Sequence, residues 1–249
     1  MYKLLFAAVL LASTSIRAES LTTLTSGFDY STGKYGTNSE TTILYVPVTL
    51  KVLYDYAYFK LTIPYISVTS VGGVVAGIGP VKKTVTTKIT TNSGLGDIVA
   101  TAGYTVFEND TFALDTVANI KFGTADAGQS LGTGENDYSA QLDGFYTAGK
   151  QTWFATAGYK VIGVPAGTSL HNIFYGTLGA SQKLNDEASA GAMLNAAQSS
   201  SDVTAGPLDV TVYYSKKTSK TGKVQFAVLK GFSDGSPDVG INVMFTGTM

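Results

Sequence analysis

The sequence predicts an all-β protein: a membrane-spanning, closed antiparallel β-barrel of about twelve strands. The first observation is the segment 94–122, where two runs with an apolar residue at every second position flank the short polar turn 108–110. Such alternation marks strands with one apolar and one polar face, and strands of roughly 9–11 residues are long enough to cross a membrane. The second observation is that this unit recurs along the chain. The third is that its connections alternate between long and short.

The N-terminus has the layout of a secretory signal peptide. Lys3 gives a basic start, residues 4–12 are apolar, and small residues lead to a cleavage site after Ala18. The apolar run is too short for a retained membrane helix, which needs about 20 residues. We therefore expect residues 1–18 to be removed and residues 19–249 to form a single barrel domain.

Composition narrows the function classes. The net charge of -1 gives no electrostatic basis for binding nucleic acid. Charged residues make up 14% of the chain, against about 25% in soluble domains. With one histidine and no cysteine, the chain has no ligand set for zinc or copper, and we expect no cofactor.

Five strands are expected in the first part of the mature chain: residues 23–31, 42–53, 57–69 and the two runs of segment 94–122. Pro47 and Pro64 fall inside the second and third of these. Because proline cannot donate to a strand ladder, we expect each one at a bulge or at a position where pairing ends.

Seven more strands are expected in the second part: residues 136–147, 153–161, 170–183, 188–197, 208–214, 224–228 and 239–245. The even total is what single-chain bacterial barrels require. Connections after the odd-numbered strands are glycine-rich and mostly longer, whereas the others are mostly short turns. Long outer loops and short periplasmic turns are the expected asymmetry, and a soluble β-sandwich, the alternative, does not predict it. The longest connection, 70–93, is the expected gate.

Aromatic residues near the expected strand ends suit the girdles that barrels place at the two membrane surfaces, although some of them could face inward. These are Tyr45, Tyr54, Tyr56, Tyr58, Phe107 and Trp153.

The polar strand faces carry the candidate functional residues, because a charge facing lipid costs about 2–4 kcal/mol at the membrane midplane. They are Lys51, Lys60, Asp115, Asn119, Lys121, Gln141, Asp143 and Lys160. Two interpretations stay open. The lumen is either a wet passage whose mixed charges set selectivity, or a network of ion pairs that fills the barrel. Eight strands leave an interior filled by side chains and 16–18 leave an aqueous channel, so about twelve is intermediate.

Two other functions are kept as alternatives to a channel. One is a lipid-modifying hydrolase that uses Ser169 and His171, whose spacing of two places both side chains on one face of a strand. A catalytic triad also needs an orienting acid and an oxyanion site. The other is a structural or adhesive barrel with no transport.

Two loop motifs are weak candidates for ligand sites. Asp126, Glu135 and Asp137 could bind calcium, but they lack the regular spacing of a calcium loop. Residues 128–134, GQSLGTG, lack the Gly-Lys-Ser/Thr ending of a phosphate loop, so we expect a flexible outer loop there.

Several segments resemble a group of bacterial outer-membrane proteins, the phenol-degradation MetA-pathway family of transporters. They are YVPVTLKV, KLTIPYISV, SGLGDIVATAGYTVF, IKFGTADAGQSLGTGENDYSAQLD, GYKVIG and KGFSDGSPD. The resemblance covers nearly the whole mature chain, and LGTGENDYS is its most specific part. One departure is the C-terminus, where Met249 stands in place of the aromatic residue that usually ends a barrel.

The resemblance implies a location and a set of partners. We expect export to the bacterial outer membrane, contact with outer-membrane lipid, and folding by the barrel-assembly machinery. The expected cargo is a small solute, with apolar or aromatic molecules among the options. No nucleic acid partner is expected, and the oligomeric state stays open.

Overall fold

The computed structural model describes residues 20–71, 74–75, 79–80, 88–203 and 205–249. The signal peptide expected at residues 1–18 lies outside the described residues. The strands are β1 (Leu21–Gly33), β2 (Thr41–Tyr54), β3 (Ala57–Ser70), β4 (Val74–Val75), β5 (Gly79–Pro80), β6 (Thr90–Leu95), β7 (Val99–Glu108), β8 (Phe112–Lys121), β9 (Asp137–Ala148), β10 (Gln151–Val161), β11 (Ile173–Lys183), β12 (Ala188–Ala197), β13 (Leu208–Lys217), β14 (Gly222–Gly231) and β15 (Val239–Thr248). One short 3₁₀ helix, η1, covers Ala127–Gln129.

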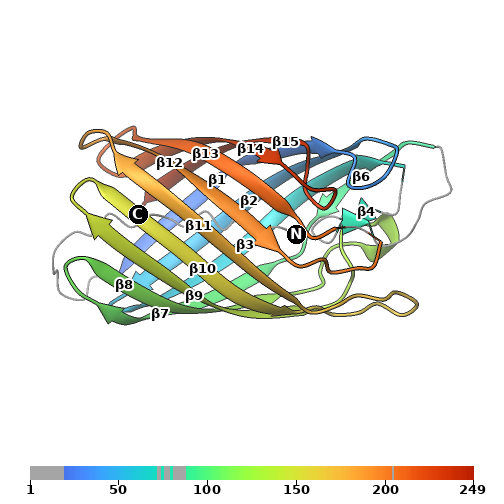
Figure 1. Ribbon diagram of the computed structural model, residues 1–249, viewed down its shortest axis with the longest axis horizontal. Helices are drawn as coiled ribbons and strands as arrows, with labels where there is room; N and C mark the ends of the chain where they lie inside the picture. The colour runs from blue at the N-terminus through green and yellow to red at the C-terminus, as the bar shows by residue number, and fades with distance from the viewer. Residues whose placement is uncertain (1–19, 72–73, 76–78, 81–87, 204) are drawn as a thin grey trace.

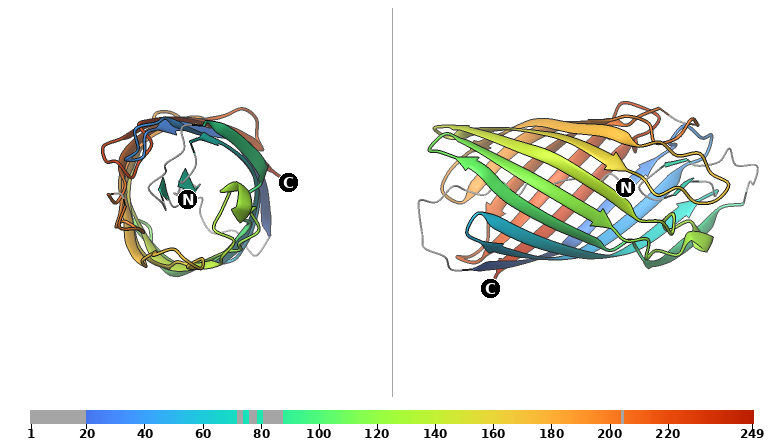
Figure 2. Two further views of the ribbon diagram at one scale, coloured as in Figure 1. Left: turned by 90° about the vertical axis from the view of Figure 1, so that its right-hand side faces the viewer. Right: turned by 90° about the horizontal axis from the view of Figure 1, so that it is seen from below.

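The strands close into one antiparallel barrel (Figures 1 and 2). Apart from β4, β5 and β6, the strands pair with their neighbours in chain order, and β15 closes the wall by pairing with β1. The sheet contains thirteen strands, but β6 and β7 both pair with β3 and together fill one position. The wall therefore has twelve positions, and the expected fold is confirmed. No helix among the described residues is long and apolar enough to cross a membrane.

The connections sort to the two ends of the barrel as the sequence predicted. The tight turns after β2, β7, β9, β11 and β13 lie at one end together with the C-terminus, on the left of Figure 1. We call this the turn end. The longer connections lie at the opposite end, here called the loop end, and β4 and β5 form a separate ribbon there. Part of the expected gate, at 72–73, 76–78 and 81–87, lies outside the described residues.

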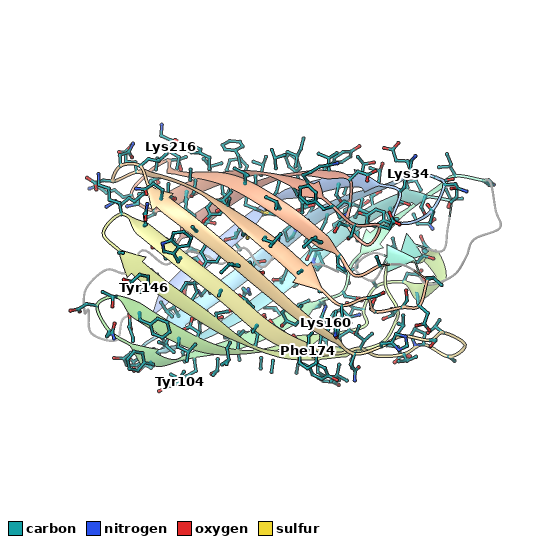
Figure 3. The ribbon with its side chains drawn as sticks, in the orientation of Figure 1. Lys34, Tyr104, Tyr146, Lys160, Phe174 and Lys216 are labelled. Carbon is teal, nitrogen blue, oxygen red and sulfur yellow. The ribbon has the colours of Figure 1, made fainter. Side chains whose placement is uncertain are left out.

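The outward strand faces are almost uncharged. Large apolar and aromatic side chains stand exposed on the outside, Tyr104, Tyr146 and Phe174 among them (Figure 3). Among the described strands, the outward rows carry two charged side chains, Lys216 and Lys230, each one residue before the end of its strand. An outer surface of this kind matches lipid and not water.

The aromatic residues expected at the girdles divide into two groups. Tyr54, Tyr56, Phe107 and Trp153 are exposed on the outside. Tyr45 and Tyr58 instead line the interior cavity, because their positions fall on the inward row of their strands.

The two strand prolines lie where pairing is interrupted, as expected. Pro47 and Pro64 are direct register partners, so each turns its backbone towards the other neighbouring strand. The β1–β2 register is interrupted opposite Pro47, and residues 96–98 separate β6 from β7 opposite Pro64. The Gly96 amide still donates to the Pro64 carbonyl at 2.8 Å. We call this interrupted band across β1, β2, β3 and β6–β7 the proline seam.

The outer face can be tested with one substitution. Val212 lies mid-strand in β13, points outwards and is 56% exposed. We expect Val212→Arg to lower the free energy of unfolding in lipid vesicles by about 2–4 kcal/mol, because the charge must enter hydrocarbon. Val212→Leu is the control and should leave stability close to wild type. Equal urea midpoints for the two variants would show that this face does not contact hydrocarbon.

Candidate functional site

The candidate site is the lumen, a cavity of about 770 Å³ lined by the inward rows of the barrel. Its lining includes Asn109 and Ser219 from connections at the turn end, and Tyr35 and Pro237 from loops at the other end. The cavity therefore reaches both ends of the wall. Burial raises the pKa of the mouth residue Tyr35 to about 12, so its hydroxyl stays protonated at neutral pH.

Strand alternation directs the sequence-predicted residues inwards. Seven of the eight line the cavity: Lys51, Lys60, Asp115, Asn119, Lys121, Asp143 and Lys160. Gln141 is also inward but lies against the wall at 5% exposure. It donates to Asp143 at 2.8 Å and accepts a hydrogen bond from the Tyr175 hydroxyl at 2.8 Å.

Lys121, at the loop end of β8, holds the loop that follows its strand. Its ammonium lies 2.8 Å from Asp97 Oδ2 and 3.5 Å from Asp137 Oδ2, and it donates to the Glu135 carbonyl at 3.0 Å. The Asp97 Oδ1 atom also accepts the Ala125 amide at 3.0 Å. Lys121 is only 8% exposed. The Lys121 ammonium is therefore paired with carboxylates and with a loop carbonyl, and these contacts anchor the loop to the barrel wall.

The anchored loop, residues 122–136, folds into the loop-end mouth. Ala125 and Leu131 are buried against Ile66 and Val68, which share the buried row of β3. Viewed along the barrel axis, η1 lies inside the ring of strands (Figure 2, left). We expected residues 128–134 to form a flexible outer loop, and this expectation is wrong. The apolar side chain of Leu131 is buried, and its contacts hold the loop against β3.

Two of the three calcium candidates, Asp126 in this loop and Asp137 at the start of β9, have other partners. Asp126 caps η1 by accepting the amides of Gly128 and Gln129. Asp137 pairs with Lys121 and accepts the Gly163 amide at 3.0 Å. Among the described residues, no group of three metal-ligating side chains is placed to hold a metal ion.

The aspartates of the lumen are held by neutral donors. Asp115 accepts the Thr105 hydroxyl at 2.7 Å, and Asp143 accepts the Thr156 hydroxyl at 2.6 Å. Two aspartates that the sequence analysis missed, Asp29 and Asp209, face the lumen in the same way. Their donors are Asn242 at 3.3 Å and Asn195 at 2.8 Å. The alternation of β1 and β13 could have identified both.

Four lysines of the lumen form no described ion pair. In the described part of the chain, the ammoniums of Lys51, Lys60, Lys160 and Lys223 have no carboxylate within 4.0 Å. The Lys51 ammonium lies 4.3 Å from the centre of the Tyr58 ring, and that of Lys160 lies 5.9 Å from the Tyr175 ring. Lys160, labelled in Figure 3, lines the cavity. Lys223 was also missed, although its inward position follows from the alternation of β14.

Aromatic rings lie flat over glycines of the neighbouring strand. A Cβ at Gly103 would overlap the Tyr58 ring, and one at Gly158 would overlap the Tyr175 ring. In both cases the glycine and the tyrosine are direct register partners. The missing side chain lets each ring lie against the wall, so the lumen stays wider than it would with the rings upright.

The hydrolase residues are not assembled into a catalytic site. The His171 Nε2 atom lies 2.8 Å from Asp202 Oδ1, and both side chains are largely exposed at the loop end. No described hydrogen bond joins His171 to Ser169. The pair instead links the β10–β11 loop to the β12–β13 loop, next to the bridge between Leu170 and Ser201.

Comparisons place the fold among outer-membrane channels. No protein-family model matches the chain, and no curated protein matches its sequence. Among solved structures, the COG4313 outer membrane channel from Pseudomonas putida F1 has a TM-score of 0.68 at 13% identity, over 95% of this chain and 97% of that one. The KdgM porin matches with 0.56 at 10% identity, over 91% and 99%. The NanC porin matches with 0.54 at 9% identity, over 90% and 98%. At these identities the likeness shows the fold.

The anchoring role of Lys121 is testable. We expect Lys121→Met to lower the free energy of unfolding by about 3–5 kcal/mol, because it leaves the buried Asp97 and Asp137 without a cation. Limited proteolysis should then cut within residues 122–136. The control is Lys183→Met, which removes the exposed partner whose hydrogen bond holds the pKa of Asp186 below its usual value. A loop as protease-resistant as wild type in Lys121→Met would remove the anchor from the account.

The ring-over-glycine contact predicts an effect on the width of the lumen. Gly103→Ala should push the Tyr58 ring into the lumen and reduce single-channel conductance by on the order of tens of per cent, because packed side chains cannot overlap. Adding Tyr58→Ala should restore the conductance. Gly247→Ala is the control, since a Cβ there meets nothing within 4 Å. Unchanged conductance in Gly103→Ala would contradict this placement of the ring.

Proposed function

We propose that this chain is an outer-membrane channel that passes small solutes by diffusion through its polar lumen. The observation that carries the proposal is the cavity of about 770 Å³ that reaches from the turn end to the loop end. Around it stand a closed wall and an almost uncharged outer face. Pores in membranes need this combination, because lipid-facing and lumen-facing residues alternate along each strand.

A wet lumen is favoured over a barrel filled by ion pairs. Among the described residues, both ion pairs inside the lumen are made by Lys121, at the loop end. The other lysines of the lumen form no described ion pair, and Asp115 and Asp143 accept hydrogen bonds from neutral donors, so their charges are not cancelled within the described protein. We propose that six of the candidate residues face the solute, while Lys121 and Gln141 hold the wall and loop. The six are Lys51, Lys60, Asp115, Asn119, Asp143 and Lys160.

The location, processing and family of the chain belong to the same proposal. Residues 1–18 act as a cleaved signal peptide, and residues 19–249 form one barrel in the bacterial outer membrane, in contact with its lipid. The barrel-assembly machinery inserts it. The resemblance to the phenol-degradation MetA-pathway proteins supports a role in solute uptake, with apolar or aromatic molecules among the possible cargo. The outer-membrane channels and porins that share the fold support the channel role.

The channel proposal can be tested with introduced cysteines, since the chain has none. Thr177 faces the lumen, and its neighbour Leu178 points outwards with 61% exposure. In planar bilayers, a bulky thiol reagent should reduce the conductance of Thr177→Cys by on the order of half, because the attached group occupies part of the lumen that the side chains leave open. Leu178→Cys should be unaffected. Absence of conductance steps in the wild-type protein would refute the channel.

A further inference from the structure

Two pairs of like charges face each other across neighbouring strands inside the lumen. Lys51 and Lys60 are direct register partners on β2 and β3. Asp115 and Asp143 are direct register partners on β8 and β9. All four side chains line the cavity. Like charges directly opposite one another destabilise a strand pair, so neither pair is explained by the stability of the sheet.

The two pairs lie at about the same depth in the barrel. From Lys60 the path runs two residues along β3 towards the turn end, to Tyr58, whose ring covers Gly103 of β7. Two residues further towards the turn end, the Thr105 hydroxyl donates to Asp115. Barrel strands tilt by roughly 35–45° from the barrel axis, so moving to a register partner, from β3 to β7 and from β7 to β8, leads towards the loop end. Moving along β3 and along β7 in this path leads back towards the turn end. The two movements offset each other.

At this depth the lumen has a basic side and an acidic side. The charge of Lys51 interacts with those of Lys60, Lys223 and Asp115, and the charge of Lys60 interacts with that of Asp143. In the described part of the chain none of these lysines approaches a carboxylate to within 4.0 Å, so the two sides do not neutralise each other. The Tyr58 ring lies between them.

We propose that this level of the lumen recognises small zwitterionic solutes. The carboxylate of the solute meets Lys51 and Lys60, and its ammonium meets Asp115 and Asp143. A solute of one sign is attracted to one side and repelled by the other, whereas a solute that carries both signs gains from both. An uncharged solute gains from neither. The inference rests on the proposed channel function and names its solute class.

The test compares β-alanine, a zwitterion, with its uncharged analogue 3-hydroxypropanamide, of similar size. Both fluxes are measured into vesicles that contain the purified protein, and the flux into protein-free vesicles is subtracted. We expect wild-type protein to pass β-alanine about three- to tenfold faster than the analogue, from favourable charge contacts on two sides. Two double variants, Lys51→Met with Lys60→Met and Asp115→Asn with Asp143→Asn, should each bring the ratio close to one.

Controls separate charge at this level from charge elsewhere. Lys34→Met and Asp55→Asn remove exposed charges in connections outside the strands and should keep the wild-type ratio. The flux of the uncharged analogue should stay the same in every variant, which shows that the barrel is folded and open. In a salt gradient, the lysine double variant should shift the reversal potential towards cation preference, and the aspartate double variant towards anion preference.

Each other outcome overturns a defined part of the account. Equal fluxes of the two solutes in wild type, with both above the protein-free background, refute zwitterion recognition and leave the channel standing. A ratio lost in only one double variant would mean that the site selects anions or cations instead. Neither solute passing above background refutes the channel itself.

Discussion

The closed ladder of backbone hydrogen bonds is the constraint on which the rest of this structure depends. Inside hydrocarbon every backbone amide and carbonyl must be paired within the protein, so the sheet has no permitted edge. Pairing of β15 with β1 removes that edge. Once the wall is closed, side-chain alternation has one meaning along every strand: one row meets lipid and the next meets the lumen. Nearly all the charged side chains of the described strands then point into the lumen, where several of them face each other.

This constraint explains which features could be predicted from the sequence. Strand identity and the inward or outward face depend on one strand at a time, and period-two alternation carries both. Lys51 and Lys60 could therefore each be assigned to the lumen from their own strands. The same rule, applied to every strand, would also have found Asp29, and it finds Lys223 once β14 begins at Gly222 instead of residue 224.

Register could not be predicted, because it belongs to two strands and to the stagger of the whole barrel. That Lys51 faces Lys60, and that Tyr58 covers Gly103, follows only when neighbouring strands are aligned. The inward loop depends on contacts that are further apart still. Lys121 and Asp97 are separated by 24 residues, and a glycine-rich composition gave no sign that Leu131 would be buried. The glycine content of the loop 122–136 permits many backbone conformations, and the burial of Leu131 selects one that packs against the barrel wall.

The proline seam gives the wall an uneven mechanical character. Where the ladder is interrupted, bending breaks fewer hydrogen bonds than it does elsewhere, so changes in cross-section concentrate on β1, β2, β3 and β6–β7. β8 and β9, which carry Asp115 and Asp143, are paired with each other without a break, but the register between β7 and β8 shifts beside Asp115, between Thr105 and Phe107. Lys51 and Lys60 lie on β2 and β3, two of the strands that the seam crosses. Any bending at the seam therefore changes the distance between these lysines and the aspartates across the lumen.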